Sequence, residues 1–249
     1  MDAKREAATE IVRRLRAEGF QAYLVGGCVR DLVMGREPKD YDVSTDATPE
    51  RVVKLYPESL TVGAQFGVVI VPRDAGNVEV ATFRSDGRYS DGRHPSEVRY
   101  AQTPQEDVRR RDFTINGLLL DPVDNQVLDY VGGQGDIRAR RIRAIGNPLD
   151  RFQEDRLRML RAVRFAARFG FSLDAAALEA IRQLAPLIHD VSAERVRDEI
   201  LKRHDHFRIQ AILPRDHDAV ADAHADENRL GDFKKNVVPE QEGKHAQRH

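Results

Sequence analysis

The chain has 249 residues, of which 41% are hydrophobic and 33% charged, with a formal net charge of −1 at pH 7. These values suit a globular protein of one large domain or two modest ones. No run approaches the roughly 18 apolar residues of a membrane span, and the acid-containing amphipathic N-terminus is unlike a signal or transit peptide. The single cysteine, Cys28, excludes an intramolecular disulfide and a cysteine-rich zinc site, and it fits a cytoplasmic location.

Short β-type runs alternate with turn signals as far as about residue 146. This pattern predicts a mixed α/β domain over residues 1–146. The expected strands are 22–26, 41–46, 66–72, 77–83 and 118–122. The expected helices are 3–18, 28–34 and 48–56, the last of which begins with Thr48 as N-cap and Pro49 in the first turn.

The pattern becomes helical after Pro148, with apolar residues recurring at helical spacing and Gly170 as a turn signal. This predicts a small helical domain over residues 147–201. Six of the eight histidines lie in the remaining segment, where apolar residues are few, so 202–249 is expected to be a poorly ordered tail.

Arginines are concentrated near the start of the helical part. The segment 138–168 contains ten of them against only three acids. A solvated helix face is the ordinary explanation of such a run, whereas arginine in preference to lysine suits phosphate and base contacts.

Two carboxylates, Asp40 and Asp42, lie two residues apart in a β-type run. Side chains alternate along a strand, so both would point to the same side of it. Two convergent carboxylates, together with substrate phosphates and water, can hold Mg²⁺. Such an ion lowers the pKa of an attacking hydroxyl and neutralises charge on transferring phosphates. Asp-x-Asp alone is weak evidence, because such pairs are common in turns.

Gly26 and Gly27 stand where a strand ends and a helix begins. At such a junction, backbone without side chains can approach a triphosphate and direct N–H groups at it. Arg30, one turn into the helix, would add a positive charge. A tight turn that binds nothing is the alternative explanation.

Glu79 lies in another alternating segment and could place a third carboxylate beside the aspartates. An outward-facing glutamate on an edge strand is the alternative, because one sequence cannot show which strands are neighbours. The polar, glycine-rich segment 85–96 has the composition of a mobile loop beside a site.

Three consecutive arginines, ending at Arg111, precede Asp112 and Asn116. On a helix, Asp112 and Asn116 would share a face and could hydrogen-bond a ribose while Arg111 contacts phosphate. A surface charge cluster is the alternative.

Asp155, Arg158 and Arg161 follow one another at intervals of three, and Arg164 extends the row. This spacing predicts a polar stripe along one helix face, opposite an apolar face. Aspartate accepts from the exocyclic amine that cytosine and adenine both carry, and arginine donates to ring or carbonyl acceptors. The pair could therefore read a base edge without a nucleic-acid template. Salt bridges on a solvated face are the alternative.

In this order, these segments resemble the class II branch of the tRNA nucleotidyltransferase and poly(A) polymerase family. The likeness spans about residues 20–200 and rests on GGCVRD followed by KDYD, EVATFR with DGRHP, RRDFTIN, and EDRLRMLRAVRFAARFGF. It implies an α/β (α+β) architecture, with a polymerase-β-like head over 1–146 and an all-helical neck over 147–201. Family members normally continue into body and tail domains that grip tRNA. The likeness fades after 192–202, so we expect these domains to be missing.

The resemblance also implies an activity, the Mg²⁺-dependent addition of C and A from CTP and ATP to tRNA 3′ ends. The 3′-hydroxyl would attack the α-phosphate, and pyrophosphate would leave. Asp40 and Asp42 would hold the metal, with Glu79 completing the carboxylate set. The residues implied in nucleotide binding are Gly27, Arg30, Arg111, Asp112, Asn116, Asp155, Arg158, Arg161 and Arg164.

Several alternatives stay open. The chain could add only C, only A, or long A tails as a poly(A) polymerase does. The poly(A) branch tends to carry a basic pair after the glycine, where this sequence has Val62-Gly-Ala-Gln-Phe66, which favours tRNA modestly. A truncated, non-catalytic RNA- or nucleotide-binding module is a further alternative, as is transfer to a small molecule or protein. The oligomeric state does not follow from the sequence.

Overall fold

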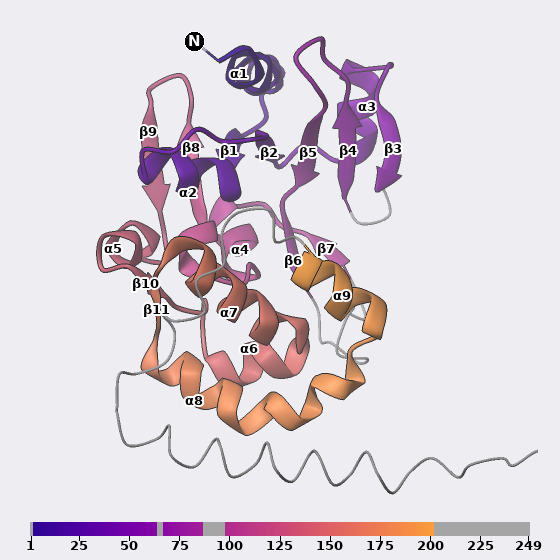
Figure 1. The fold of residues 1–249 in the computed structure, drawn as a ribbon. Helices are drawn as coiled ribbons and strands as arrows, with labels where there is room; N and C mark the ends of the chain where they lie inside the picture. Colours follow the sequence, from indigo (N-terminus) through magenta and orange to yellow (C-terminus); the bar gives the residue numbers. More distant parts are fainter. Residues whose placement is uncertain (1, 64–66, 87–97, 202–249) are drawn as a thin grey trace, which may run out of the picture. The chain divides into compact units, whose positions relative to one another are not determined.

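The computed structural model describes residues 2–63, 67–86 and 98–201, all of which belong to one compact unit (Figure 1). The tail predicted over 202–249 and nearly all of the loop predicted over 85–96 lie outside these ranges. No helix in the described ranges combines the length and apolar character that crossing a membrane requires.

A seven-stranded mixed sheet forms the centre of the head, in the spatial order β3-β4-β5-β2-β1-β8-β9. Its strands are β1 (Ala22–Val25), β2 (Asp42–Thr45), β3 (Leu60–Gly63), β4 (Val68–Val71), β5 (Val78–Thr82), β8 (Leu118–Asp121) and β9 (Gln126–Asp129). Strands β2 and β5 pair in parallel with Val43 opposite Val80, whereas the other neighbours pair antiparallel. The two strands that carry the predicted carboxylates are therefore adjacent in the middle of the sheet.

The predicted strands and helices of the head are confirmed to within about two residues. The helices are α1 (Ala3–Ala17), α2 (Gly27–Val33), α3 (Pro49–Leu55), α4 (Pro104–Arg109) and α5 (Gly133–Arg138), with a 3₁₀ turn, η2 (Thr114–Asn116). A separate hairpin pairs β6 (Arg84–Asp86) with β7 (Val98–Tyr100). The sequence pattern did not reveal α4, α5, β3, β6, β7 or β9. These elements are short, and β9 has no fully buried residue to produce an alternating apolar signal.

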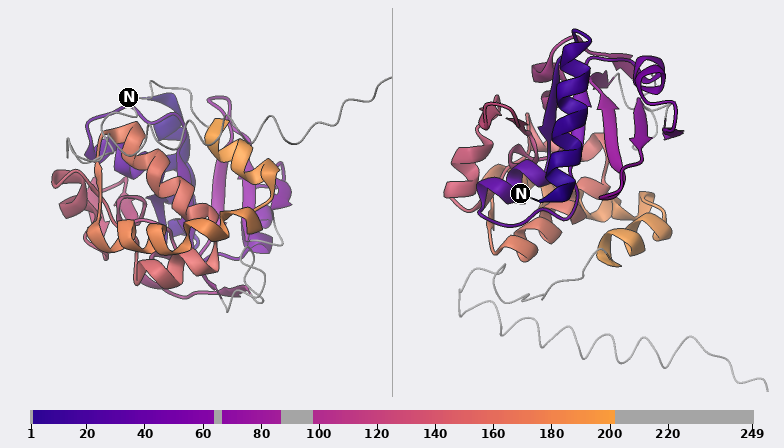
Figure 2. Two further views of the ribbon diagram at one scale, coloured as in Figure 1. Left: turned by 60° about the horizontal axis from the view of Figure 1, so that its bottom comes forward. Right: turned by 90° about the horizontal axis from the view of Figure 1, so that it is seen from above.

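Helix α1 covers one face of the sheet (Figure 2). Its buried residues, among them Ile11 and Leu15, share a core with Leu24, Val43 and Val80 of the strands. Side chains alternate along a strand, so the residues next to Val43 and Val80 point to the opposite face. Asp42 and Glu79 are such residues, and this alternation places both carboxylates on the side away from α1.

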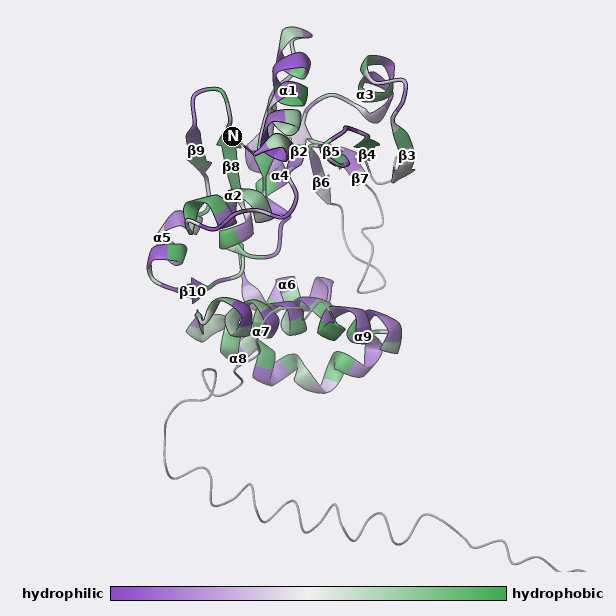
Figure 3. Ribbon diagram, turned by 45° about the horizontal axis from the view of Figure 1, so that its top comes forward, coloured by the Kyte–Doolittle hydropathy of each residue, from purple (hydrophilic) through white to green (hydrophobic). Residues whose placement is uncertain are grey.

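The chain becomes helical at Pro148, as predicted. Figure 3 shows these helices gathered on one side of the head. They are α6 (Pro148–Glu154), α7 (Leu157–Phe169), α8 (Ala175–Leu184), the 3₁₀ helix η3 (Ala185–Asp190) and α9 (Ala193–Leu201). Gly170, with a φ of 67°, ends α7 in the left-handed conformation that glycine adopts without strain.

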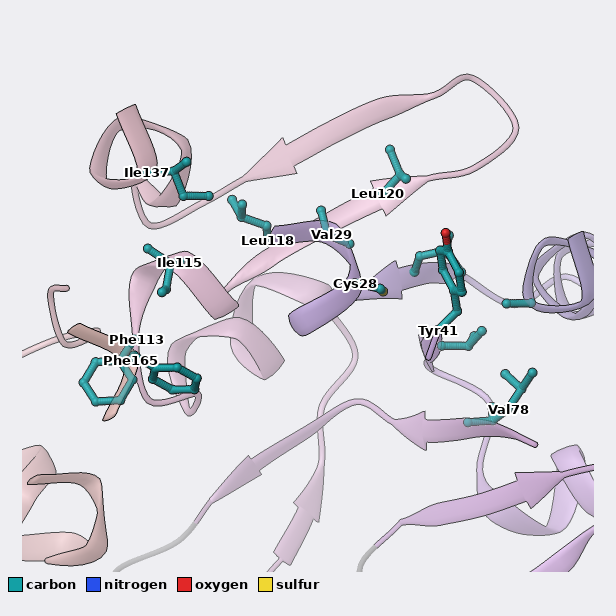
Figure 4. Close-up of a cluster of buried hydrophobic side chains, with 14 of the residues drawn as sticks. Cys28, Val29, Tyr41, Val78, Phe113, Ile115, Leu118, Leu120, Ile137 and Phe165 are labelled. Atoms are coloured by element: carbon teal, nitrogen blue, oxygen red, sulfur yellow. The ribbon is translucent and has the colours of Figure 1, made fainter. Parts of the chain in front are cut away.

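The head and the helical part share one hydrophobic core. Phe113 of the head packs edge-to-face against Phe165 of α7, with ring centroids 5.7 Å apart and an interplanar angle of 83° (Figure 4). Strand β10 (Arg141–Ile142) also pairs with β11 (Ser172–Leu173), beyond α7. The change near residue 146 is thus a change of element type within a continuous core, and the division into head and neck stays a prediction.

Candidate active site

Asp42 is the first residue of β2, where pairing with Val25 begins. Tyr41 and Val43 are buried in the core, so burial alternates on either side of Asp42, whereas the shared side expected for Asp40 and Asp42 stays a prediction. Asp40, however, lies just before the strand. Its side chain is 77% exposed and stands 3.3 Å from Lys4 Nζ. The two aspartates therefore differ in environment, one at the end of a paired strand and the other at the surface.

Glu79 lies beside Asp42, because the residues that follow them, Val80 and Val43, are opposite each other in the parallel register, and the charge of Glu79 acts on Asp42. Strand β5 is internal to the sheet, so Glu79 is not on an edge strand, but its side chain is exposed, as the alternative supposed. Burial, together with the negative charges of Glu79 and Asp40, raises the pKa of Asp42 to about 6, and the positive charge of Arg111 opposes this rise. The region around Asp42 thus carries an excess of negative charge.

This charge excess fits a cation. Mg²⁺ is typically held by one or two carboxylates together with phosphates and water. Within the described ranges no group of three or more histidine, cysteine or acidic side chains is arranged to hold a metal. The assignment of Asp40 and Asp42 as the protein ligands of such an ion stays a prediction. When bound, such an ion supplies charge neutralisation and activation of a hydroxyl.

The glycine pair forms the predicted junction. Gly26, with a φ of 76°, follows β1, and Gly27 is the first residue of α2. A Cβ atom added to Gly26 would stand 3.3 Å from Nη1 of Arg111. Arg111 is in turn held by Asp107, a fully buried carboxylate that accepts from Nη2 at 2.8 Å. The guanidinium is thereby fixed next to side-chain-free backbone and within electrostatic reach of Asp42, which is a favourable place for a phosphate.

Arg30 is buried, with only 5% of its surface exposed. Its Nη1 donates to Oδ1 of Asn116 at 2.7 Å, and its Nε donates to Asp31 at 2.8 Å. The guanidinium also lies 4.7 Å from the ring centroid of Phe169. Arg30 therefore connects α2 to η2 and α7 in this conformation, and the predicted contact with a triphosphate stays a prediction.

Asp112 and Asn116 do not share a helix face, contrary to expectation. Helix α4 ends at Arg109, and only 114–116 form a 3₁₀ turn. The two side chains still meet, because Asn116 Nδ2 donates to Asp112 Oδ1 at 3.2 Å. The other oxygen, Oδ2, accepts from Arg161 Nη2 at 2.6 Å and Nε at 2.9 Å. Asp112 consequently joins the head to α7.

The predicted stripe is only partly helical. Asp155 has extended backbone angles and lies between α6 and α7, whereas Arg158, Arg161 and Arg164 belong to α7. The solvated-face alternative is wrong, because Arg158 is only 8% exposed and donates to Glu154 at 2.6 Å. Arg161 reaches Asp112 as described above. Arg158 thus forms a local salt bridge with Glu154, whereas Arg161 of the same stripe binds a residue far away in the chain.

Hydrogen bonds link the glycine junction to the stripe through Arg30, Asn116, Asp112 and Arg161 in succession. The predicted residues from both parts of the chain are therefore brought together. Four partners were missed by sequence reasoning, namely Asp107, Glu154, Arg195 and Glu199. Spacing could have indicated two of them, since Asp107 lies four residues before Arg111 and Glu154 lies four residues before Arg158.

Two family models match the chain. One, described as the poly A polymerase head domain, matches residues 22–143, and the other, described as a probable RNA and SrmB-binding site of polymerase A, matches residues 170–203. Together they cover more than half of the chain. The chain belongs to the tRNA nucleotidyltransferase and poly(A) polymerase family. The predicted family and its polymerase-β-like head are thereby confirmed.

Named relatives of this family are CCA-adding enzymes. That of Bacillus pumilus (strain SAFR-032) is 44% identical over 195 residues, which are 78% of this chain and 48% of the relative. The crystal structure of the Bacillus stearothermophilus CCA-adding enzyme in complex with CTP is 39% identical, with a TM-score of 0.74, and the match covers 81% of this chain and 49% of that one.

A tRNA nucleotidyltransferase complexed with a primer tRNA and an incoming ATP analog is 29% identical, with a TM-score of 0.64 over 77% of this chain and 55% of that one. The chain spans about half the length of the curated relatives it matches. Enzymes of this nucleotidyltransferase family generally use a divalent metal.

Proposed function

We propose that this chain is a template-independent RNA nucleotidyltransferase that adds C, A or both, from CTP and ATP, to the 3′ ends of tRNA. The observation that carries the proposal is the position of Asp42. Its half-buried carboxylate lies beside Glu79 and within electrostatic reach of Arg111, on the face of the sheet away from α1. Family membership and the relatives that act as CCA-adding enzymes support the same reaction. A cytoplasmic location belongs to this proposal.

The residues divide the chemistry between them. Asp40 and Asp42 would hold Mg²⁺, and Glu79 would add negative charge on the neighbouring strand. Arg111, fixed by Asp107 next to Gly26, would contact the phosphates. The RNA 3′-hydroxyl would attack the α-phosphorus, and the bond to pyrophosphate would break. No nucleophile from the protein is required.

Base selection would belong to Asp155 and Arg158. An aspartate accepts a hydrogen bond from the amine of cytosine or adenine, while arginine donates to their acceptors. Gly27, Arg30, Asp112 and Asn116 would support the nucleotide between this pair and the carboxylates. Arg161 and Arg164 would support the base-reading pair.

An incorporation assay tests the proposal. The protein with Mg²⁺ would receive tRNAs that end before, within and after CCA, with CTP alone, ATP alone or both. Products that stop at CCA, at CC or after one A would support tRNA end addition and identify which residues are added. Long A tails would identify a poly(A) polymerase instead. Absence of incorporation at high protein concentration would contradict both enzyme functions and favour a binding module.

Removal of the proposed metal ligands provides the matched variant. We expect Asp40→Ala with Asp42→Ala to abolish incorporation, since the site would lose both of its proposed protein ligands. Asp74→Ala with Asp124→Ala removes the same charge from two exposed positions and should leave activity unchanged. Full activity in the first double variant would refute the metal assignment.

A further inference from the structure

Helix α9 contacts α7 through charged side chains. Within α9, all of which the structure describes, Glu199 is the only buried residue. Its apolar residues Ile200 and Leu201 are 46% and 62% exposed, and neither buried hydrophobic cluster of the described residues includes a residue of α9. Apolar burial therefore contributes little to the placement of α9, and its polar contacts matter correspondingly more.

These polar contacts are made to the stripe of proposed base-reading and supporting residues, namely Asp155, Arg158, Arg161 and Arg164. Arg195 Nη2 donates to both carboxylate oxygens of Asp155, each at 3.1 Å. One turn further along α9, Glu199 accepts from Arg164 Nε at 2.6 Å and lies 3.8 Å from Arg161 Nη1. Helix α9 thus contacts both the first and the last residue of the stripe, Asp155 and Arg164.

Asp155 needs such a partner because no helix fixes its side chain. Its backbone is extended, with φ −146° and ψ 105°, in the connection between α6 and α7. Within the chain, the backbone N–H of Leu157 donates to Oδ1 at 3.1 Å. A carboxylate offers about four acceptor sites, so Oδ2 keeps acceptor capacity beyond its bond to Arg195. Arg195 and Leu157 together thereby fix the direction in which the remaining acceptor points.

We infer that Arg195 is a positioning residue that orients the Asp155 carboxylate toward the exocyclic amine of an incoming cytosine or adenine. The inference rests on the proposed function and adds a specificity role for α9. Uracil carries a carbonyl where cytosine carries the amine, and two acceptors facing each other repel. A correctly held Asp155 therefore favours CTP over UTP, and ATP over GTP for the same reason.

The test measures nucleotide binding rather than catalysis. Dissociation constants of CTP, UTP, ATP and GTP would be determined for the full chain with Mg²⁺ by calorimetry. We expect Arg195→Gln to lower the CTP-to-UTP preference by about tenfold, mainly through weaker CTP binding, because a carboxylate held by the Leu157 N–H without Arg195 is less often in place. The preference for ATP over GTP should fall in parallel.

Two further variants make the result specific. Arg197→Gln removes the same charge from the same helix, but Arg197 is 65% exposed and pairs only with the adjacent Asp198 among the described residues, so selectivity should not change. Arg195→Lys keeps the charge and loses the planar guanidinium, and we expect about a threefold loss of preference. Thermal unfolding would confirm that each variant is folded.

The outcomes separate the inference from the function on which it rests. A wild-type protein that binds neither CTP nor ATP would contradict the proposed function itself. A wild-type protein that prefers CTP, with a folded Arg195→Gln or Arg195→Lys protein that keeps the whole preference, would overturn only the role of Arg195. An equal loss in Arg197→Gln would also overturn it, since the effect would then be one of net charge.

Discussion

Asp112 and Arg161 are separated by 49 residues in the chain and form one of the shortest ion pairs of the described structure, at 2.6 Å. Burial raises the pKa of Asp112, but the charge and hydrogen bonds of Arg161, with those of Asn116 and the Phe113 N–H, outweigh burial and lower it overall. A carboxyl whose pKa is lower in the folded state stabilises the fold above its unfolded pKa of about 3.9. This contribution is lost as the pH falls through the folded-state value.

The ion pair of Asp112 and Arg161 predicts that the difference in stability between the wild type and an Asp112→Asn variant depends on pH. At pH 7 we expect Asp112→Asn to lower the free energy of unfolding by about 2 kcal/mol, because Arg161 loses a charged acceptor. The difference should shrink as the pH falls below about 4, where Asp112 of the unfolded wild-type chain takes up a proton, and should be lost once the pH has fallen through the lower folded-state pKa. Urea unfolding from pH 3 to pH 7 measures it, with exposed Asp124→Asn as the control. A difference that is constant over this range would contradict the assignment.

Helix α5 supports the 3₁₀ turn that carries Asn116. Asp136 of α5 is buried and accepts from Thr114 Oγ1 at 2.6 Å and from Arg143 Nε at 2.8 Å. At the start of the same helix, a Cβ added to Gly133 would lie 2.2 Å from the backbone oxygen of Thr114. Only glycine permits this approach of α5 to the turn.

Gly133→Ala is therefore expected to displace the turn and to lower the free energy of unfolding by about 2–3 kcal/mol. Nucleotide binding should weaken as well, because Asn116 moves with the turn. Gly135→Ala in the same helix meets nothing within 4 Å and should stabilise the protein by roughly 0.5–1 kcal/mol. Urea unfolding and CTP calorimetry check both. Equal stability of the two variants would show that the close approach has no consequence.

At the scale of the whole described structure, the larger buried cluster contains residues of both the head and the helical part, so we expect the two parts to unfold together. We expect Phe165→Ala to remove about 3–5 kcal/mol, because it leaves a cavity against Phe113. All six tyrosines lie before residue 146 and there is no tryptophan, so tyrosine fluorescence reports on the head alone. A mutation in α7 should therefore shift the tyrosine transition as much as the helical signal in circular dichroism.

The control for this experiment is Leu187→Ala, at a position that is 39% exposed, where the change should stay within about 0.5 kcal/mol. If Phe165→Ala shifts the circular dichroism transition and leaves the tyrosine transition in place, the two parts fold independently. Such a result would favour the division at residue 146 over the continuous core.

The sequence by itself determined the family, the main strands and helices of the head, and the residue types of the candidate site. The alternation of apolar and polar residues indicated Asp42 and Glu79, and the glycine pair indicated the turn from β1 to α2. Both signals depend only on neighbours within a few residues. The helical spacing likewise located α7. Such patterns involve residues only a few positions apart, so they can be recognised in the sequence alone.

Only the folded chain decided which groups meet. The adjacency of β2 and β5 places Glu79 beside Asp42. The contact of α9 with the stripe gives Asp155 its partner Arg195. Pairings across 35 to 49 residues leave no periodic signal, because any arginine can reach any carboxylate that the packing brings near. The sequence therefore supplied the chemical groups of the candidate site, whereas tertiary packing determined their partners, their burial and their orientation.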